Sequence, residues 1–357
     1  MKLLYLYRYG ILGGVCTQLL HRLRHLDANL GIEVHCGFQS DHGVSDMLSP
    51  YATLHFGLNG ENTTSFLEQE AFDLVVVIDS EEYLQAMKTM ENRPTLLVEV
   101  HTSIERNLSY LSRIQTNEVE GFFTVSEYMK TRIKAHVSET FDTPQISLFS
   151  NVLDTDLFSP IPLNAEGPPI VCWVGKIDDH KDWKAFMHIS ERIHKGQPDA
   201  EFWIIGGQTC SQERAIEVFD LADERGIIER FRWIDRVENV NMPKLYSLVS
   251  QRGGIKLVTS HCESFGMSVL EALLSGCPVV ATDVGALSEI VQQNDAYSLY
   301  QLKDFDAASE RAQHMLENQT RLVKRLASLR PSLVELYDSQ HRVTEYWSKL
   351  LVYGDGA

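Results

Sequence analysis

The residues with the clearest capacity for chemistry lie in one segment, where two glutamates stand eight positions apart. The segment begins with the apolar run Ile255–Val258, and Glu263 follows in a polar loop. Glu271 lies in an apolar stretch that Gly276 ends and Pro278 follows, a pattern typical of a short helix before a second buried strand. The first amides of a helix have no partner within the helix and attract anions. The segment therefore predicts a binding site for a sugar that is linked to a diphosphate.

The two acids have different predicted tasks. Glu263, in an irregular loop, can accept hydrogen bonds from several hydroxyl groups of a hexose. Glu271, about one turn into the helix, leans back toward the helix start and can bind a ribose. Gly266 lets the backbone come close to a ligand, and the amides of the next three residues can bind phosphate oxygens without a metal ion. The expected donor-binding residues in this segment are Ser264, Phe265, Gly266, Met267, Ser268, Val269 and Glu271.

Chance is the competing explanation for this spacing. Asp and Glu make up 49 of the 357 residues, so two acids at this separation will recur without any function. The context of strand, loop, helix and second strand is what favours the functional interpretation over chance.

Two lysines, Lys176 and Lys181, share a loop between the apolar run Ile170–Val174 and a predicted helix. Cations beside a diphosphate stabilise the bound donor and the negative charge that develops on the leaving group. Three aspartates lie between or beside the two lysines, so an ordinary solvated loop explains the same pattern.

The sequence resembles the retaining glycosyltransferases of family 4. Residues 263–272, Glu-Ser-Phe-Gly-Met-Ser-Val-Leu-Glu-Ala, are similar to the Glu-x7-Glu signature of that family. The resemblance covers nearly the whole chain, and it implies an α/β protein with the GT-B fold, in which two Rossmann-like parallel-sheet domains face a central cleft. The further similar segments, in the family's order, are Gly13-Gly14-Val15, Val100-His101-Thr102, residues 123–126, residues 150–154 with Phe158, Val174-Gly175-Lys176 with Lys181, and residues 281–290.

The resemblance also implies roles for individual residues. His101 would hydrogen-bond the donor sugar near its anomeric carbon, although a single histidine is more often structural and the chain has 13. Lys176 and Lys181 match a pair that binds the diphosphate, in which Lys176 replaces an arginine and so lacks its planar, bidentate fork. With Glu263, these three residues are the expected catalytic residues. The turn at Asn151 lacks the family's usual Pro and Gly, so no contact is assigned to it.

The turn Gly13-Gly14 has three interpretations. The resemblance implies that it approaches the phosphates and the reacting centre from the first domain, which makes both glycines donor-binding residues. An ordinary tight turn between a strand and a helix needs no ligand. A dinucleotide fingerprint is disfavoured, because Gly10-Ile-Leu-Gly13-Gly14-Val does not match Gly-x-Gly-x-x-Gly.

The expected reaction is a metal-independent, retaining transfer of a hexose-type sugar from a nucleotide diphosphate, UDP by default or GDP. The acceptor is unidentified, and small molecules, glycans and lipid-linked acceptors all remain open. No cofactor is expected, because the nucleotide sugar is a substrate. A retaining hydrolase is disfavoured, since it needs two carboxyl groups at one glycosidic bond and Glu271 is assigned to the ribose. The alternative is a catalytically weak nucleotide-sugar-binding or regulatory protein that keeps the fold.

Composition excludes several other classes. A net charge of −17 disfavours nucleic acid and anionic lipid surfaces as partners, because both require a basic face. The six cysteines lack metal-binding spacing and are predicted to be reduced. We expect no transmembrane segment and no signal peptide, and hence a cytoplasmic protein.

Apolar runs alternate with amphipathic segments as in βαβ units, which predicts parallel sheets with helices on both faces. We expect an acceptor-side domain of residues 1–160, a nucleotide-sugar-binding domain of residues 161–334, and a C-terminal helix at about 335–357 that packs on the first domain. Residues 159–169, rich in Pro and polar side chains, are the expected linker. The predicted strands are 3–7, 33–36, 74–78, 95–100, 121–125 and 145–149, then 170–174, 201–205, 231–234, 255–258 and 278–281.

Overall fold

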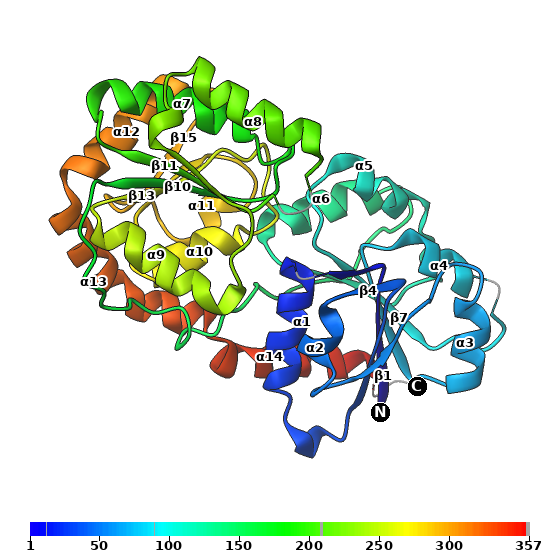
Figure 1. The fold of residues 1–357 in the computed structure, drawn as a ribbon. Helices are drawn as coiled ribbons and strands as arrows, with labels where there is room; N and C mark the ends of the chain where they lie inside the picture. The colour runs from blue at the N-terminus through cyan, green and yellow to red at the C-terminus, as the bar shows by residue number, and fades with distance from the viewer. Residues whose placement is uncertain (12, 89, 208–209, 355–357) are drawn as a thin grey trace. The chain divides into compact units, whose positions relative to one another are not determined.

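The computed structural model describes residues 1–11, 13–88, 90–207 and 210–354, and the chain divides into two compact units. The first unit comprises Met1–Asp154 together with Tyr337–Ala357, and the second comprises Thr155–Leu336. Each unit is built on a parallel β-sheet that helices cover (Figure 1).

The first unit contains a seven-stranded sheet with the order β5-β3-β1-β6-β7-β8-β9, and all neighbouring strands in it are parallel. The central strand β6 is buried at all five positions, as expected for a strand with both faces covered. The strands are β1 Lys2–Tyr7, β3 Glu33–Gly37, β5 Thr53–His55, β6 Leu74–Ile78, β7 Thr95–Val100, β8 Gly121–Thr124 and β9 Ile146–Leu148, and a separate parallel pair is formed by β2 Tyr9–Ile11 and β4 Ser40–His42.

The C-terminal helix α14 belongs to the core of the first unit. Its Tyr346 and Trp347 join the buried cluster that contains Tyr5 of β1. The sequence placed one helix at about 335–357, but α14 begins at Ser339, because Asp338 ends the preceding helix and its side chain accepts a hydrogen bond from the amide of His341 (3.1 Å). Residues 355–357 lie outside the described residues. The helices of this unit are α1 Gly14–Arg24, η1 Ala28–Leu30, α2 Val44–Leu48, α3 Thr63–Glu70, α4 Glu81–Met87, α5 Glu105–Leu108, η2 Ser109–Arg113, α6 Glu127–Val137 and α14 Ser339–Gly354.

The second unit contains a six-stranded parallel sheet with the order β12-β11-β10-β13-β14-β15. Helices α9 and α10 lie on one face of this sheet, and α7, α8 and α12 lie on the other (Figure 1). The elements are β10 Ile170–Val174, α7 Trp183–Gly196, β11 Glu201–Ile205, α8 Gln212–Glu224, η3 Ile228–Arg230, β12 Phe231–Ile234, η4 Asn239–Asn241, α9 Met242–Gln251, β13 Ile255–Val258, α10 Met267–Leu274, β14 Val279–Thr282, α11 Leu287–Ile290, β15 Tyr297–Tyr300, α12 Phe305–Glu317 and α13 Gln319–Tyr337.

The boundary between the units lies at residues 154 and 155, earlier than the predicted 160 and 161. The proline-rich segment after it is fixed to the second unit by hydrogen bonds. The amide of Ile161 donates to Ser247 Oγ (2.9 Å), and the amide of Leu163 donates to Gln251 Oε1 (2.7 Å). The segment is therefore part of the second unit and does not act as a free linker.

Six strands, β6, β7, β10, β11, β12 and β13, have the predicted bounds. Strand β14 begins at Val279 and not at Pro278, because proline has no amide to donate to the ladder. The sequence missed β2, β4, β5 and β15, which are short and lie at sheet edges or outside the main sheets, where a strong apolar run is not required.

Within the part of the chain that the structure describes, no helix is both long and apolar enough to cross a bilayer. The same residues contain no group of three or more His, Cys, Asp or Glu side chains placed to hold a metal ion. None of the six cysteines forms a disulfide bond with another described residue, and four of them are buried.

Candidate active site

An ion pair between Lys181 and Glu263 lies at the carboxyl edge of the second sheet, in the loops that follow β10 and β13. Glu263 Oε1 is 2.5 Å from Lys181 Nζ and 2.6 Å from Ser260 Oγ. Burial raises the pKa of Glu263, but the charge of Lys181 and the two hydrogen bonds outweigh it, so the pKa lies below its ordinary value. Oε2 makes no hydrogen bond with another described residue. The site thus presents an ionised carboxylate with one oxygen open to a ligand.

Hydrogen bonds between the loops that follow β10 and β13 position Lys181. The amide of Lys181 donates to Asp178 Oδ1 (2.9 Å), and the Thr259 hydroxyl, after β13, lies 2.8 Å from the carbonyl oxygens of Lys181 and Asp182. Asp182 adopts a left-handed conformation (φ 49°), caps α7 by accepting from the amide of Ala185, and lies 2.8 Å from His261 Nε2. This network fixes the lysine relative to the loop that contains Glu263.

Two glycines, Gly266 and Gly285, allow close packing around the loop that contains Glu263. Gly285 has φ +58°, and an added Cβ there would overlap the carbonyl oxygen of Glu263, which also accepts from the amide of Ala286 (2.9 Å). Gly266 precedes α10 with φ +101°, and an added Cβ would overlap Leu287 Cδ2. Both positions therefore require glycine for conformation and for space.

Gly266→Ala is expected to lower the free energy of unfolding of the second unit by roughly 2–4 kcal/mol, the sum of left-handed strain and overlap with Leu287. Urea denaturation followed by tryptophan fluorescence measures it, since four of the five tryptophans lie in this unit. The matched control is Gly226→Ala, at φ +68° with no atom within 4 Å, which should cost only roughly 1–2 kcal/mol. Equal losses in the two variants would show that the contact with Leu287 is unimportant.

The helix start provides fewer open amides than the sequence predicted. The amide of Val269 donates to the carbonyl of Gly266 (2.9 Å), so this amide already has a partner, and phosphate binding by Val269 stays a prediction. The amide of Ser268 makes no hydrogen bond to another described residue. Phe265 is buried, whereas Ser264, Met267 and Ser268 are partly exposed.

Glu271 lies within α10, is 9% exposed, and faces a buried polar cluster that the sequence analysis missed. Its Oε2 is 3.4 Å from the Tyr246 hydroxyl, which is 3.3 Å from Lys256 Nζ. Burial raises the pKa of Glu271, and the charge of Lys256 together with the Tyr246 hydrogen bond opposes that rise. A lysine inside the apolar run Ile255–Val258 was the available signal.

Lys176 lies on the same loop as Lys181 but is exposed, and it forms no ion pair with another described residue. In the first unit, Gly13 precedes α1 in an extended conformation, and an added Cβ at Gly14 would meet no atom within 4 Å. Neither glycine is required by its own conformation. Gly13, Gly14 and His101 belong to the first unit, and Lys176 and Glu263 belong to the second.

His101 is positioned by a buried ionic network at the end of β7. Its Nε2 is 2.7 Å from Glu99 Oε1, and Arg22 of α1 binds both oxygens of Glu99 at 2.6 and 2.9 Å. The guanidinium of Arg22 lies 4.0 Å from the ring centroid of Tyr346. Burial raises the pKa of Glu99, but Arg22 and His101 lower it far below its ordinary value. An ionised Glu99 assigns the hydrogen to Nε2 of His101 and leaves Nδ1 for a ligand.

Asp79, at the end of β6, is a second acid near His101 that the sequence analysis missed. It has a left-handed conformation (φ 45°), and its carboxylate accepts from the amide of His101 at 3.1 and 3.2 Å. Burial raises the pKa of Asp79 to about 6. Its position after the predicted strand 74–78 was the available signal.

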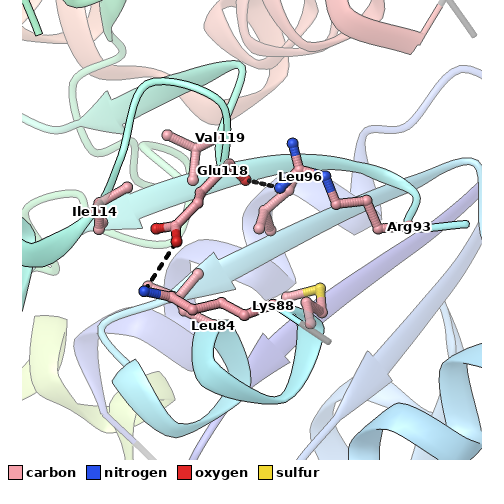
Figure 2. Close-up of a pocket in the computed structure, with 8 residues that line it drawn as sticks. Leu84, Lys88, Arg93, Leu96, Ile114, Glu118 and Val119 are labelled. Atoms are coloured by element: carbon pink, nitrogen blue, oxygen red, sulfur yellow. Dashed lines mark hydrogen bonds and ion pairs between the residues drawn. The ribbon is translucent and has the colours of Figure 1, made fainter. Parts of the chain in front are cut away.

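A small cavity lies apart from these residues, and a larger hollow borders them. A cavity of about 10 Å³ in the first unit is lined by residues that include Glu118, whose carboxylate pairs with Lys88 (3.0 Å) and whose backbone carbonyl accepts from Arg93 (2.8 Å; Figure 2). It has room for about one water molecule and not for a substrate. A larger hollow of about 360 Å³ in the second unit is lined by residues that include Asp182 and His261, the neighbours of Lys181 and Glu263 in the sequence.

Residues 154–329 match the family model described as "Glycosyl transferases group 1". The matched segment contains Lys176, Lys181, Glu263 and Glu271, and it coincides with most of the second unit.

Curated relatives match part of the chain. The 2-deoxystreptamine N-acetyl-D-glucosaminyltransferase of Streptomyces fradiae is 28% identical over 185 residues, which cover 51% of this chain and 42% of the relative. The D-inositol 3-phosphate glycosyltransferase of Nocardia farcinica is 32% identical over 131 residues, which cover 36% of this chain and 28% of the relative. The chain thus spans less than half the length of these relatives.

Solved structures match over the whole chain. Anabaena HepE in complex with UDP and glucose has a TM-score of 0.84 and 15% identity, with 99% of this chain and 100% of that chain covered. Sucrose-phosphate synthase of Thermosynechococcus elongatus has a TM-score of 0.80 and 16% identity, with both chains fully covered. The prediction of the GT-B fold, with two parallel-sheet α/β units, is confirmed.

Proposed function

We propose that this chain is a retaining, metal-independent glycosyltransferase that transfers a hexose-type sugar from a nucleotide diphosphate. The pairing of Lys181 with Glu263 at 2.5 Å, inside the segment that matches the glycosyl transferases group 1 model, is the observation on which the proposal rests most. UDP is the preferred nucleotide, with GDP as the alternative. Support for UDP comes from the similar fold of HepE, whose structures contain UDP and UDP-glucose.

In the proposed reaction each residue of the site has a separate task. The open oxygen of Glu263 accepts hydrogen bonds from the sugar, and Lys181 and Lys176 offset the charge of the diphosphate as the bond to the sugar breaks. The ribose binds Glu271. His101 uses Nδ1 to orient the sugar, because Nε2 is held by Glu99. The protein thus acts by positioning groups and offsetting charge.

The acceptor is assigned to the first unit. Several relatives are named for transfer to 2-deoxystreptamine or D-inositol 3-phosphate, both of which are cyclitols. A chain with a net charge of −17 favours a neutral or cationic acceptor over an anionic one. We therefore propose cyclitols, with the amine-bearing ones first, as the acceptors to test.

A thermal-shift panel of UDP-glucose, GDP-mannose and dTDP-glucose tests the proposal. A donor at a hundredfold excess over its Kd should stabilise the folded protein by about 2.7 kcal/mol, which raises the unfolding midpoint. Lys181→Met should remove most of this shift, because the diphosphate loses its cation. Lys184→Met, three residues on and exposed, is the control and should keep the shift. The proposal fails if none of the three donors stabilises the native protein.

A further inference from the structure

Lys256 is a fully buried lysine in the middle of the second sheet. It occupies the second position of β13, with Cys172 of β10 and Val279 of β14 as its neighbours across the sheet, and its exposure is 0%. An ammonium group at such a position is costly unless it is hydrogen-bonded and its charge is offset. The ammonium of Lys256 must therefore have polar or charged partners among the residues that surround it.

The ammonium connects the sheet to the helix that begins the donor site. Lys256 Nζ donates to the carbonyl of Ser268, in the first turn of α10, at 2.6 Å and lies 3.3 Å from the Tyr246 hydroxyl. That hydroxyl is in turn 3.4 Å from Glu271 Oε2. Residues of β13, α9 and α10 thus form one buried chain of polar groups that ends at Glu271.

The charges at the two ends of this chain depend on each other. Burial raises the pKa of Glu271, and the charge of Lys256 is the largest influence that lowers it. Burial lowers the pKa of Lys256 to about 8, and Glu271 is the largest influence that raises it. The other titratable groups that face Lys256 are Tyr246, Cys172, Cys277 and Glu263. Loss of the ammonium would therefore favour the neutral form of Glu271.

We propose that Lys256 is a positioning residue for donor binding, which acts through Tyr246 to hold Glu271 as a carboxylate that accepts hydrogen bonds from a ribose. The inference rests on the proposed function, because Glu271 needs a nucleoside donor as its ligand. A carboxylate accepts from both hydroxyls of a ribose, whereas a protonated Glu271 has one oxygen that donates and so accepts less well.

Lys256→Met tests the role, with UDP and inorganic pyrophosphate as probes in titration calorimetry. The variant should fold with some loss of stability, because Glu271 can take up a proton once the ammonium is gone and so need not remain as an unpaired buried charge. The affinity for UDP should fall by about tenfold or more, whereas pyrophosphate, which has no ribose, should bind within about twofold of the native affinity. Lys244→Met, on the exposed side of α9, is the matched control and should bind both probes normally.

Tyr246→Phe provides a second variant, which removes only the hydroxyl that links Lys256 to Glu271. It should weaken UDP binding in the same direction as Lys256→Met and leave pyrophosphate binding unchanged. If Lys256→Met does not fold, UDP binding by Tyr246→Phe tests the proposed link between Lys256 and Glu271.

The pH dependence gives a signature that a purely structural role would not produce. Without the ammonium, the pKa of Glu271 is no longer lowered by Lys256, so the carboxylate forms only at higher pH. UDP binding by Lys256→Met should therefore strengthen as the pH rises, and it should reach its plateau at a higher pH than UDP binding by the native protein.

The outcomes separate this inference from the proposed function. If the native protein binds UDP and a folded Lys256→Met or Tyr246→Phe binds it equally well, the role of Lys256 is refuted and the proposed function stands. An equal loss of UDP and pyrophosphate binding would also refute it, since Lys256 would then merely support the first turn of α10. A native protein that binds none of UDP, GDP and dTDP refutes both.

Discussion

Glu263→Gln is expected to reduce turnover of the donor by about a hundredfold or more, in line with the loss of one preorganised polar group from an active site. The carboxylate is held by Lys181 and Ser260 through Oε1, and its other oxygen is open to the sugar. Glutamine has nearly the same shape but no charge, and its amide nitrogen would place a donor where an acceptor is needed. Release of UDP from UDP-glucose, with and without cyclitols, measures the effect.

The matched control for Glu263→Gln is Glu229→Gln, an exposed glutamate of the same unit outside the site. Both variants should give the native unfolding midpoint to within a few degrees, because a partly exposed ion pair contributes about 1 kcal/mol or less to the free energy of unfolding. The double variant with Lys181→Met should lose little more than the single variants do, since the two residues act as one unit. Native turnover in a folded Glu263→Gln would refute the assigned site.

Arg22→Met is expected to lower the opening free energy of the first unit by about 3–5 kcal/mol, the typical cost of removing one partner of a buried ion pair. Both side chains of the Arg22 and Glu99 pair are 1% exposed, so removal of the cation leaves a buried carboxylate whose remaining partners among the described residues are His101 and the Tyr346 hydroxyl. Hydrogen exchange of the amides in α1 and β7 measures the effect, because this unit contains only one of the five tryptophans.

Arg24→Met is the matched control in the same helix. Arg24 pairs with Asp154 at 3.3 Å, and the two side chains are 37% and 26% exposed. A pair at the surface contributes about 1 kcal/mol or less, because water and salt screen it. Similar losses in Arg22→Met and Arg24→Met would contradict a special role for the buried network.

The difference between the native protein and Arg22→Met should also depend on pH. The pKa of Glu99 is held far below its ordinary value in the folded state, so its pairing stabilises the protein above the unfolded pKa of about 4.3. This stabilisation is lost as the pH falls through the range below about 4.3. The stability difference between the two proteins should therefore be constant near neutral pH and shrink in acid.

Local patterns were sufficient for most of the fold. The strands β6, β7, β10, β11, β12 and β13 could be predicted residue by residue, because a strand covered on both faces needs an unbroken apolar run. The loop that contains Glu263, the helix α10 and the glycine before it could be predicted because all of them lie within one short segment. Edge strands such as β5 lack such runs, and the sequence missed them.

The sequence by itself determined the residue types of the site, the apolar strands and the resemblance to a glycosyltransferase family. Only the tertiary structure decided which charged groups meet. Lys181 and Glu263 are 82 positions apart, and Arg22 and Glu99 are 77 apart. Their encounters depend on which strands are neighbours in each sheet, and that order differs from the order along the chain. The protonation states of these groups follow from burial and from such partners, so composition and spacing could not predict them.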